Sequence, residues 1–316
     1  MPNLSLTDNH FKGIQKNKKA LQLDDYTRAG KIAAEVREMV RKRNWVGKTV
    51  YEICEEVENQ IKIRGAKCAF PVNVSINEIA AHYTAEPNDP IVITDSDLVK
   101  IDLGAQINGY IADTAVTVCQ DVQYYGLIQA AEDALSNAMA MIKVGVKASD
   151  IGRIIEKTIK QTGFKPIANL SGHSLDQYTI HAGRSIPNIW SVGGFTLAEN
   201  TAYACEPFVT TEKGGGFVRN GNIKNIFALN SRKKTKEEEA DKLLDYIWEK
   251  FNMLPFALRW IVKDWEEEKA RKLLELLINK KAVQAYPILI EINEQRVAQA
   301  EHTFIPNESG VTVTTI

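Results

Sequence analysis

One segment, KIDLGAQINGYIADTAVTV (residues 100–118), constrains the fold more tightly than any other part of the sequence. It carries Asn108-Gly109 between two apolar runs, and this dipeptide favours a two-residue β-hairpin turn because both positions accept a positive φ. Such a turn fixes the register of the hairpin, with Ile107 opposite Tyr110. The sequence therefore predicts two antiparallel strands whose cross-strand neighbours can be named from the turn outward.

The predicted register puts two aspartates on the same face of the hairpin. Asp102 falls opposite Ala115 and Asp113 falls opposite Gly104, and residues two apart on a strand share a face. The two carboxylates become diagonal neighbours, and their repulsion requires a proton or a cation between them. The small residues opposite them predict a hollow with room for ions. The alternative interpretation is that both aspartates face water.

The composition is that of a globular chain and excludes several classes of partner. Hydrophobic residues make up 44% of the 316 residues, which is enough for a large core, and the net charge of −1 gives no general attraction to DNA or to an anionic membrane. No apolar run approaches the roughly 18 residues of a membrane span, and no signal peptide is predicted. The cysteines form no CxxC pair, which favours reduced thiols in the cytoplasm; they are Cys54, Cys68, Cys119 and Cys205.

A weak internal repeat relates two parts of the chain at an offset of 98 residues. Each copy predicts two amphipathic helices, along the apolar stripes of 26–40 and 50–61 in the first copy and near 124–143 and 149–162 in the second. Strand-like sequence follows each pair, so the repeat predicts a pseudo-symmetric α/β domain with a site between its halves. Chance similarity of amphipathic helices is the alternative. The matched positions include Tyr26/Tyr124, Gly47/Gly145, Glu58/Glu156 and Gly65/Gly163.

Residues 231–286 differ in character from the rest of the chain. Two stretches within them, 232–251 and 263–283, are strongly helical by composition and keep their leucines at helical spacing. The sequence predicts a helical insertion subdomain here, within a main domain made of residues 1–230 and 287–316. The nearly balanced charge of the insertion does not indicate a nucleic-acid surface.

Three further residues stand in unusual surroundings and could complete a metal site with the two aspartates. His173 follows Ser-Gly, which predicts a loop or a strand end, and Glu206 precedes a proline, which predicts a strand end or bulge. Glu301 is a charge in an otherwise apolar strand, whereas the adjacent His302 should face the opposite way. Four carboxylates and one imidazole suit Mn, Fe, Co or Zn pairs better than a structural zinc.

Two other histidines, His82 and His181, lie in segments at the border between polar and apolar sequence. Local sequence leaves two interpretations open for them. They could bind substrate, or they could be histidines whose hydrogen bonds are satisfied within the core.

Five motifs follow one another along the chain: FPVNVSINEIAAHYT, KIDLGAQINGYIADTAVTV, SGHSLDQYTIHAGRSIPNI, CEPF and AQAEHTFI. Together they resemble methionine aminopeptidase type 2, and the similarity runs from about residue 20 to the C-terminus. All five ligand positions of that family are present in order, and a helical insertion lies between Glu206 and Glu301 as in the type 2 enzymes. The polybasic extension of the eukaryotic enzymes is missing, so the archaeal form fits best.

The resemblance implies a fold and a metal centre. The fold would be the pita-bread α/β fold, a pseudo-two-fold curved antiparallel sheet backed by helices, with a winged-helix-like insertion. Two divalent ions (Co, Mn, Fe, Zn or Ni) would be bound, with Asp113 and Glu301 bridging them. Asp102 would hold one ion, and His173 with Glu206 would hold the other.

The resemblance also implies an activity, the removal of the N-terminal methionine from nascent proteins whose second residue is small. A water between the ions would ionise near neutral pH and attack the carbonyl. Glu206 would move the proton to the leaving amine, and His181 would stabilise the charge on the carbonyl oxygen. His82 would contact the scissile region, and Phe70 would line the methionine pocket. A monomer is expected, and the insertion is a candidate surface for docking to the ribosome.

Two rival interpretations follow from the same fold. A proline-specific dipeptidase or aminopeptidase would share the five ligands, although the FPVNVSINEIAAHYT segment and the placement of the insertion argue against it. A non-catalytic relative that binds the ribosome or RNA would have lost ligands, and here none is lost.

Overall fold

The predicted aspartate hairpin is present in the structure, a computed structural model that describes residues 5–316, with side chains from residue 22 onward. Strands β4 (Val99–Ile107) and β5 (Tyr110–Val118) pair without interruption from Ile107↔Tyr110 to Val99↔Val118. Asn108 and Gly109 have φ values of 52° and 87°, as a type I′ turn requires. The register predicted from the sequence is therefore confirmed.

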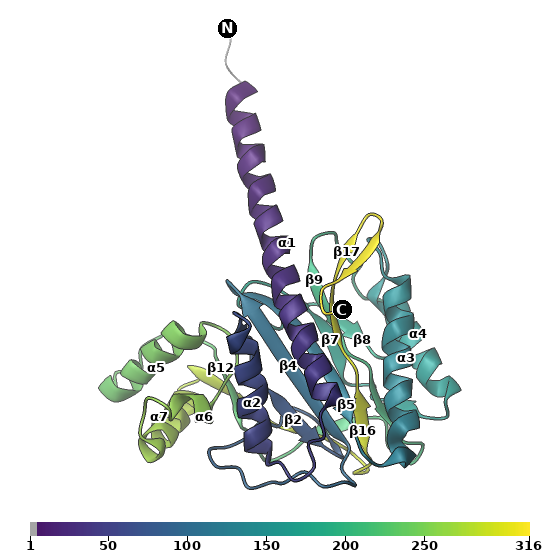
Figure 1. The fold of residues 1–316 in the computed structure, drawn as a ribbon. Helices are drawn as coiled ribbons and strands as arrows, with labels where there is room; N and C mark the ends of the chain where they lie inside the picture. The colour runs from purple at the N-terminus through teal and green to yellow at the C-terminus, as the bar shows by residue number, and fades with distance from the viewer. Residues whose placement is uncertain (1–4) are drawn as a thin grey trace.

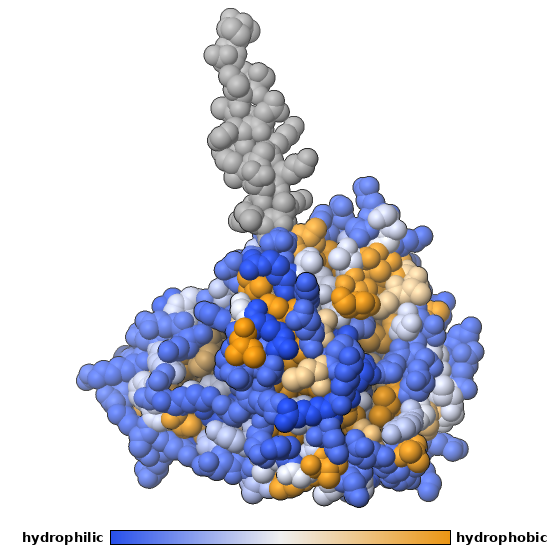
Figure 2. Space-filling model, in the orientation of Figure 1, coloured by the Kyte–Doolittle hydropathy of each residue, from blue (hydrophilic) through white to orange (hydrophobic). Residues whose placement is uncertain are grey.

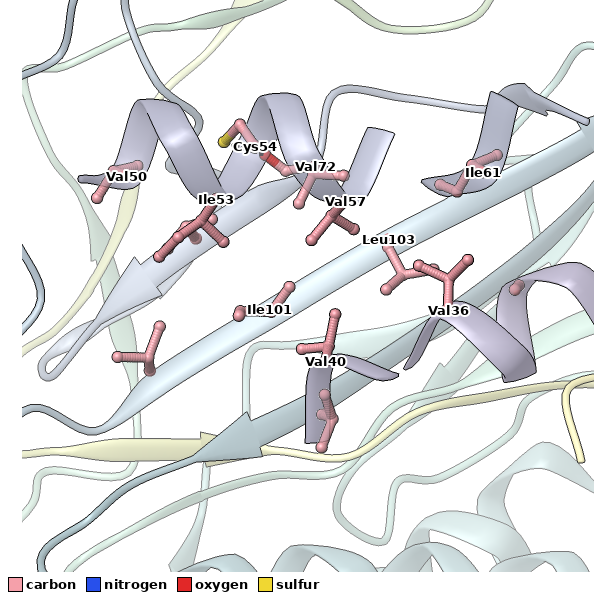
Figure 3. Close-up of a cluster of buried hydrophobic side chains, with 14 of the residues drawn as sticks. Val36, Val40, Val50, Ile53, Cys54, Val57, Ile61, Val72, Ile101 and Leu103 are labelled. Carbon is pink, nitrogen blue, oxygen red and sulfur yellow. Dashed lines mark hydrogen bonds between the residues drawn. The ribbon is translucent and has the colours of Figure 1, made fainter. Parts of the chain in front are cut away.

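The hairpin forms the centre of the first half of the molecule. Strands β1 (Lys67–Cys68) and β2 (Asn73–Ile76) pair antiparallel with β4, and helices α1 (Ser5–Lys42) and α2 (Val50–Ile63) cover one face of this sheet (Figure 1). The apolar stripes predicted for both helices supply the core. Figure 3 shows valines of the two helices converging on Ile101 and Leu103 of β4. The face that carries the aspartates points away from these helices, because side chains alternate along a strand.

The second half repeats this arrangement with its own helices and sheet. Helix α3 (Tyr125–Met141) follows the short 3₁₀ helix η1 (Val122–Tyr124) and precedes α4 (Ala148–Gln161), close to the predicted ranges. Both pack on strands of the second half (Figure 1). The strand order there is β18-β17-β9-β7-β8, with bounds Gly310–Val313, His302–Asn307, Ala202–Cys205, Ser171–Leu175 and Ser185–Pro187.

Two small sheets complete the main body. One has the order β16-β10-β6 (Val297–Gln299, Phe208–Thr210 and Lys165–Pro166), and the other has the order β11-β15-β3 (Val218–Asn220, Leu289–Glu291 and Ile79–Ala81). Each joins strands from distant parts of the chain. Residues on either side of the insertion are thereby brought together.

The internal repeat is visible in matching backbone contacts. The amide of Gly47 donates to the carbonyl of Ile93 at 2.8 Å, and the amide of Gly145 donates to that of Leu197 at 3.0 Å. An isolated β-bridge follows in each half, Thr49↔Val92 and Lys147↔Thr196. All four repeat glycines have positive φ: Gly47 (83°), Gly145 (87°), Gly65 (90°) and Gly163 (84°). The two halves thus place their helix pairs by the same local geometry.

The segment predicted as an insertion contains three helices and two strands of a small sheet, whose central strand precedes the segment. The helices are α5 (Glu238–Phe251), α6 (Leu258–Ile261) and α7 (Glu267–Asn279), and the sheet has the order β13-β12-β14 (Phe256–Ala257, Ile226–Leu229 and Val283–Tyr286). A separate apolar cluster joins these elements, including residues of β12, which precedes residue 231. The predicted boundaries 231–286 remain a prediction.

The surface seen in Figure 2 is mainly hydrophilic, with apolar side chains in small groups. Within the part of the chain that the structure describes, no helix combines the length and the apolar character that crossing a membrane requires. The four cysteines are all free, in agreement with the prediction of reduced thiols.

Candidate metal centre

The structure brings the five predicted ligand residues into one pocket from separate strands. Asp102 lies on β4, Asp113 on β5 and His173 on β7, while Glu206 lies between β9 and β10 and Glu301 lies immediately before β17. The pocket has a cavity volume of about 70 Å³. This volume admits several water-sized particles, since one needs roughly 10–15 Å³.

Three of the five side chains form the tightest group. Asp113, His173 and Glu301 each offer one ligand atom, and these atoms all lie within 4.8 Å of one another. His173 Nε2 lies 3.7 Å from Asp113 Oδ2 and 3.5 Å from Glu206 Oε1. Asp102 lies two register positions from Asp113 along the hairpin and lines the same pocket. Four carboxylates and one imidazole thus share a small space.

The carboxylates of this pocket repel one another in a medium of low polarity. Burial raises the pKa of Asp102 to about 7. Burial and the neighbouring carboxylates raise the pKa values of Asp113, Glu206 and Glu301 well above their ordinary range. Burial lowers the pKa of His173 to about 3, so its imidazole is neutral and can offer a lone pair. A bound cation would reverse the penalty on the carboxylates.

The hydrogen bonding of these side chains fits a metal site. Asp102 Oδ1, Asp113 Oδ1 and Glu301 Oε1 are buried and have no hydrogen-bond partner. Buried acceptors without partners are rare because each loses its hydration without compensation. Gln299 Nε2 lies 3.4 Å from Glu301 Oε2 and donates to it, which orients that carboxylate. Unpartnered oxygens facing one small space are what divalent ions coordinate.

The local structure of His173 differs from the prediction. The prediction of a loop or strand end was wrong, because His173 is the central residue of β7 and pairs with Ala204 of β9 and Ser185 of β8. The preceding Gly172 does not form a turn but allows two neighbouring strands to lie close together. The carbonyl oxygen of Ala204 would lie 2.2 Å from a Cβ at this position, so only glycine allows the strands to approach.

The positions of Glu206 and His302 agree with the predictions from the sequence, and Glu301 lies between β16 and β17. Glu206 stands with Pro207 between β9 and β10, at a strand end as predicted. Glu301 forms an isolated bridge with Ala115, the residue opposite Asp102. The adjacent His302 faces the other way, as predicted, where its Nδ1 contacts Arg37 and Thr315.

The hollow predicted opposite Asp113 does not exist as open space. A Cβ at Gly104 would lie 2.3 Å from Cε1 of Phe70, so the aromatic ring occupies the volume that the glycine leaves. The prediction that Gly104 leaves room for ions was therefore wrong. The ring of Phe70 instead forms a wall of the pocket beside the aspartates.

Both histidines whose role the sequence left open, His82 and His181, line the pocket. The ring of His181 lies 4.5 Å from that of His173, edge to face, and 6.4 Å from that of Tyr286. His82 lies 5.8 Å from Tyr286, and its Nδ1 is 3.3 Å from the carbonyl oxygen of Pro287. Its φ of 69° is unusual for a residue with a side chain and is typical of strained functional positions.

The electrostatics keep these two imidazoles neutral. Burial, with a further contribution from His181, lowers the pKa of His82 to about 4. The surrounding protein also lowers the pKa of His181, although this side chain is solvent-exposed. Neutral imidazoles can donate hydrogen bonds to a substrate without adding positive charge near bound cations.

Several residues of the pocket were not singled out from the sequence. Asn73 is the cross-strand partner of Asp102, and strand alternation alone could have indicated that it faces the site. Tyr286 comes from β14 and carried no local signal. The others are apolar wall residues, Ala81, Ile180, Ile226 and Pro255.

Comparison with known sequences connects this geometry to a family of hydrolases. The sequence profile of metallopeptidase family M24 matches residues 24–225. The methionine aminopeptidase of Methanocaldococcus jannaschii is 43% identical over 287 residues, which make up 91% of this chain and 96% of the relative.

Comparison with solved structures confirms the predicted fold. The methionine aminopeptidase of Thermotoga maritima superposes with a TM-score of 0.66 at 23% identity, over 93% of this chain and 96% of that one. A prolidase from Pyrococcus furiosus superposes with a TM-score of 0.60 at 18% identity, over 93% of this chain and 64% of that one. At these identities the likeness concerns the fold alone, which is the pita-bread fold.

Proposed function

This chain belongs to metallopeptidase family M24, and on that premise we propose that it removes the N-terminal methionine from polypeptides whose second residue is small. The observation that carries the proposal is the convergence of four carboxylates and one neutral imidazole in a single buried pocket. The 43% identity to a methionine aminopeptidase over almost the whole chain supports the choice of substrate.

We further propose that the chain is a type 2 enzyme of the archaeal form. The support is the segment with α5, α6 and α7, which separates Glu206 from Glu301 in the sequence. This segment contributes Tyr286 to the pocket wall, so it takes part in building the site.

The ligand set is Asp102, Asp113, His173, Glu206 and Glu301, in the roles that the family resemblance implies. Asp113 and Glu301 would help to hold two divalent ions, and their ligand atoms lie with that of His173 in one group within 4.8 Å. Bound there, the ions would polarise the scissile carbonyl and activate water. Carboxylate and imidazole donors are compatible with Mn, Fe, Co, Ni or Zn, and the donor set does not discriminate between these metals.

The chain's own residues would bind the peptide and move its protons. Glu206, 3.5 Å from His173 Nε2, would take a proton from the attacking water and pass it to the leaving amine. His181 at the mouth would donate a hydrogen bond to the carbonyl oxygen. His82 would contact the scissile region, and the ring of Phe70 would contact the methionine side chain.

The proposal makes a prediction about substrates. With Mn²⁺ or Co²⁺ present, the protein should release methionine from Met-Ala-Ser and leave Ala-Pro peptides intact. His173→Ala should bind metal more weakly, and its kcat/KM should fall by at least about 100-fold, because changing a residue that only hydrogen-bonds to a metal ligand already costs about 10- to 100-fold. Amino-acid analysis of the products and metal analysis of the purified proteins check both statements.

Two outcomes would contradict this proposal. Cleavage of only the Ala-Pro peptides would assign the chain to the proline-specific enzymes that share its fold. Full activity of His173→Ala would overturn the ligand set.

The activity implies that nascent chains in the cytoplasm are the substrates. A monomeric state and docking of the insertion to the ribosome remain predictions.

A further inference from the structure

One polar side chain of the pocket has no role in the function proposed above. Asn73 lies on β2, is 4% exposed and is the direct cross-strand partner of Asp102 on β4. Direct cross-strand partners project from the same face, with their Cβ atoms about 4.5–5.5 Å apart. Asn73 therefore stands beside the carboxylate of Asp102 in the wall of the pocket.

The orientation of the Asn73 amide follows from its one hydrogen bond. Nδ2 lies 2.8 Å from the carbonyl oxygen of Pro71. Because a carbonyl oxygen only accepts, the NH₂ group must face Pro71, and Oδ1 must point the other way. Oδ1 is buried and has no partner among the described residues. The chain thus holds an unpaired acceptor next to Asp102, and such an atom loses its hydration without compensation unless something donates to it.

We infer that Asn73 Oδ1 accepts a hydrogen bond from the free α-amino group of the bound peptide. The inference rests on the proposed function, in which the first residue of the peptide enters this pocket. A methionine side chain carries no donor, so the donors of that first residue belong to its amino group. Asn73 is thus a substrate-positioning residue that makes a free amino terminus a condition of tight binding.

The chemistry favours an amide over another carboxylate at position 73. Four carboxylates already share the pocket, and a further one would raise their mutual repulsion. An amide oxygen offers a lone pair without net charge. Four other pocket atoms are also unpartnered, but their residues belong to the proposed ligand set and would be engaged by cations: Asp102 Oδ1, Asp113 Oδ1, His173 Nδ1 and Glu301 Oε1. Asn73 Oδ1 then remains as the acceptor that the amino group can use.

The test compares two ligands that differ only in the amino group. L-Methionine and its desamino analogue, 4-(methylthio)butanoate, are titrated calorimetrically into the Mn²⁺-loaded full-length protein and into Asn73→Leu, which has the same branching and number of heavy atoms but no acceptor. We expect Asn73→Leu to weaken methionine binding by about 10- to 100-fold, the range for a hydrogen bond to a charged group. Binding of the desamino analogue should change by less than about twofold.

Two further variants separate this role from a structural one. Asn73→Asp keeps an acceptor and should retain most of the preference for methionine over the analogue. Ser75→Ala is the matched control, because Ser75 lies on the same strand, is buried and also has an unpartnered oxygen, but does not line the pocket. It should bind both ligands like the unmodified protein. With Met-Ala-Ser, Asn73→Leu should raise KM more than it lowers kcat.

Several results would overturn the inference. Equal weakening of both ligands by Asn73→Leu would show that Asn73 acts through packing. Weaker Mn²⁺ binding in a metal titration of Asn73→Leu would make the residue a metal ligand. If the unmodified protein released no methionine from peptides, the proposed function would fail, and the paired titration would still decide whether Asn73 recognises the amino group.

Discussion

At the scale of single residues, the pocket depends on a glycine that makes space for an aromatic ring. Gly104 lies between Asp102 and Gln106 on the aspartate face of β4, and Phe70 fills the volume beside it. This wall of the pocket therefore depends on a contact between residues 34 positions apart in the sequence. A single added methyl group should disturb it.

We predict that Gly104→Ala displaces the ring of Phe70, because the new Cβ would lie 2.3 Å from the present position of Cε1. KM for Met-Ala-Ser should rise by roughly tenfold, and stability should fall by about 1–3 kcal/mol, the range for overpacking. Steady-state kinetics and urea unfolding measure the two effects. Combining Gly104→Ala with Phe70→Leu should restore part of the stability.

Gly126→Ala is the control for this prediction. A Cβ there would lie 3.7 Å from Phe164, an ordinary contact, and Gly126 is inside α3. Alanine should therefore be neutral or slightly stabilising. An unchanged KM in Gly104→Ala would show that Phe70 does not shape the substrate pocket.

At the scale of elements, a buried ion pair joins α6 to α2. Arg259 and Glu58 are both almost completely buried, and Arg259 Nη1 donates to Glu58 Oε2 at 2.7 Å while Nη2 bonds Oε1. Trp260 donates to the same carboxylate, and so does the amide of Val72, next to Asn73. The network connects the segment with α5, α6 and α7 to the backbone of the pocket wall.

We predict that Arg259→Ala lowers the free energy of unfolding by about 3–5 kcal/mol, because it leaves the Glu58 carboxylate buried without its partner. Lys272→Ala breaks a pair with Glu268 in which both side chains are more than 70% exposed, and should cost at most about 1 kcal/mol. Urea unfolding of the two variants gives the comparison. Equal losses would mean that the buried pair does not hold the elements together.

At the scale of the whole molecule, the carboxylates of the pocket link stability to pH and to metal. The folded metal-free protein holds protons on these groups that the unfolded chain releases, since burial raises their pKa values. Stability should therefore fall as pH rises toward the folded-state pKa values. His82 and His173 have lowered pKa values, so their contribution makes stability rise with pH, but only up to their ordinary pKa of 6.5.

We predict that the chelated protein unfolds at a lower temperature at pH 8 than at pH 6.5. Added Mn²⁺ should raise the melting temperature more at pH 8, because its ligands must lose their protons to bind it. Thermal unfolding with and without metal at both pH values tests this. The double variant Asp113→Asn with Glu301→Gln should flatten the response of the metal-free protein, and an unchanged response would place the linkage elsewhere.

The sequence by itself determined the features that local geometry sets. Asn108-Gly109 imposes a type I′ turn, and the turn with strand alternation gives every pair from Ile107↔Tyr110 to Asp102↔Ala115. Motifs identified the residues that converge in the pocket, and periodicity placed α3 and α4 close to their observed bounds.

Only the tertiary structure determined which distant segments come into contact in the pocket. It placed Phe70 against Gly104, made His173 the centre of a strand and brought Tyr286 to the pocket. It also left Asn73 Oδ1 without a donor beside Asp102. The reason is physical, because turns and strand registers follow from neighbouring residues, whereas packing and hydrogen bonding across a pocket depend on how separate elements meet.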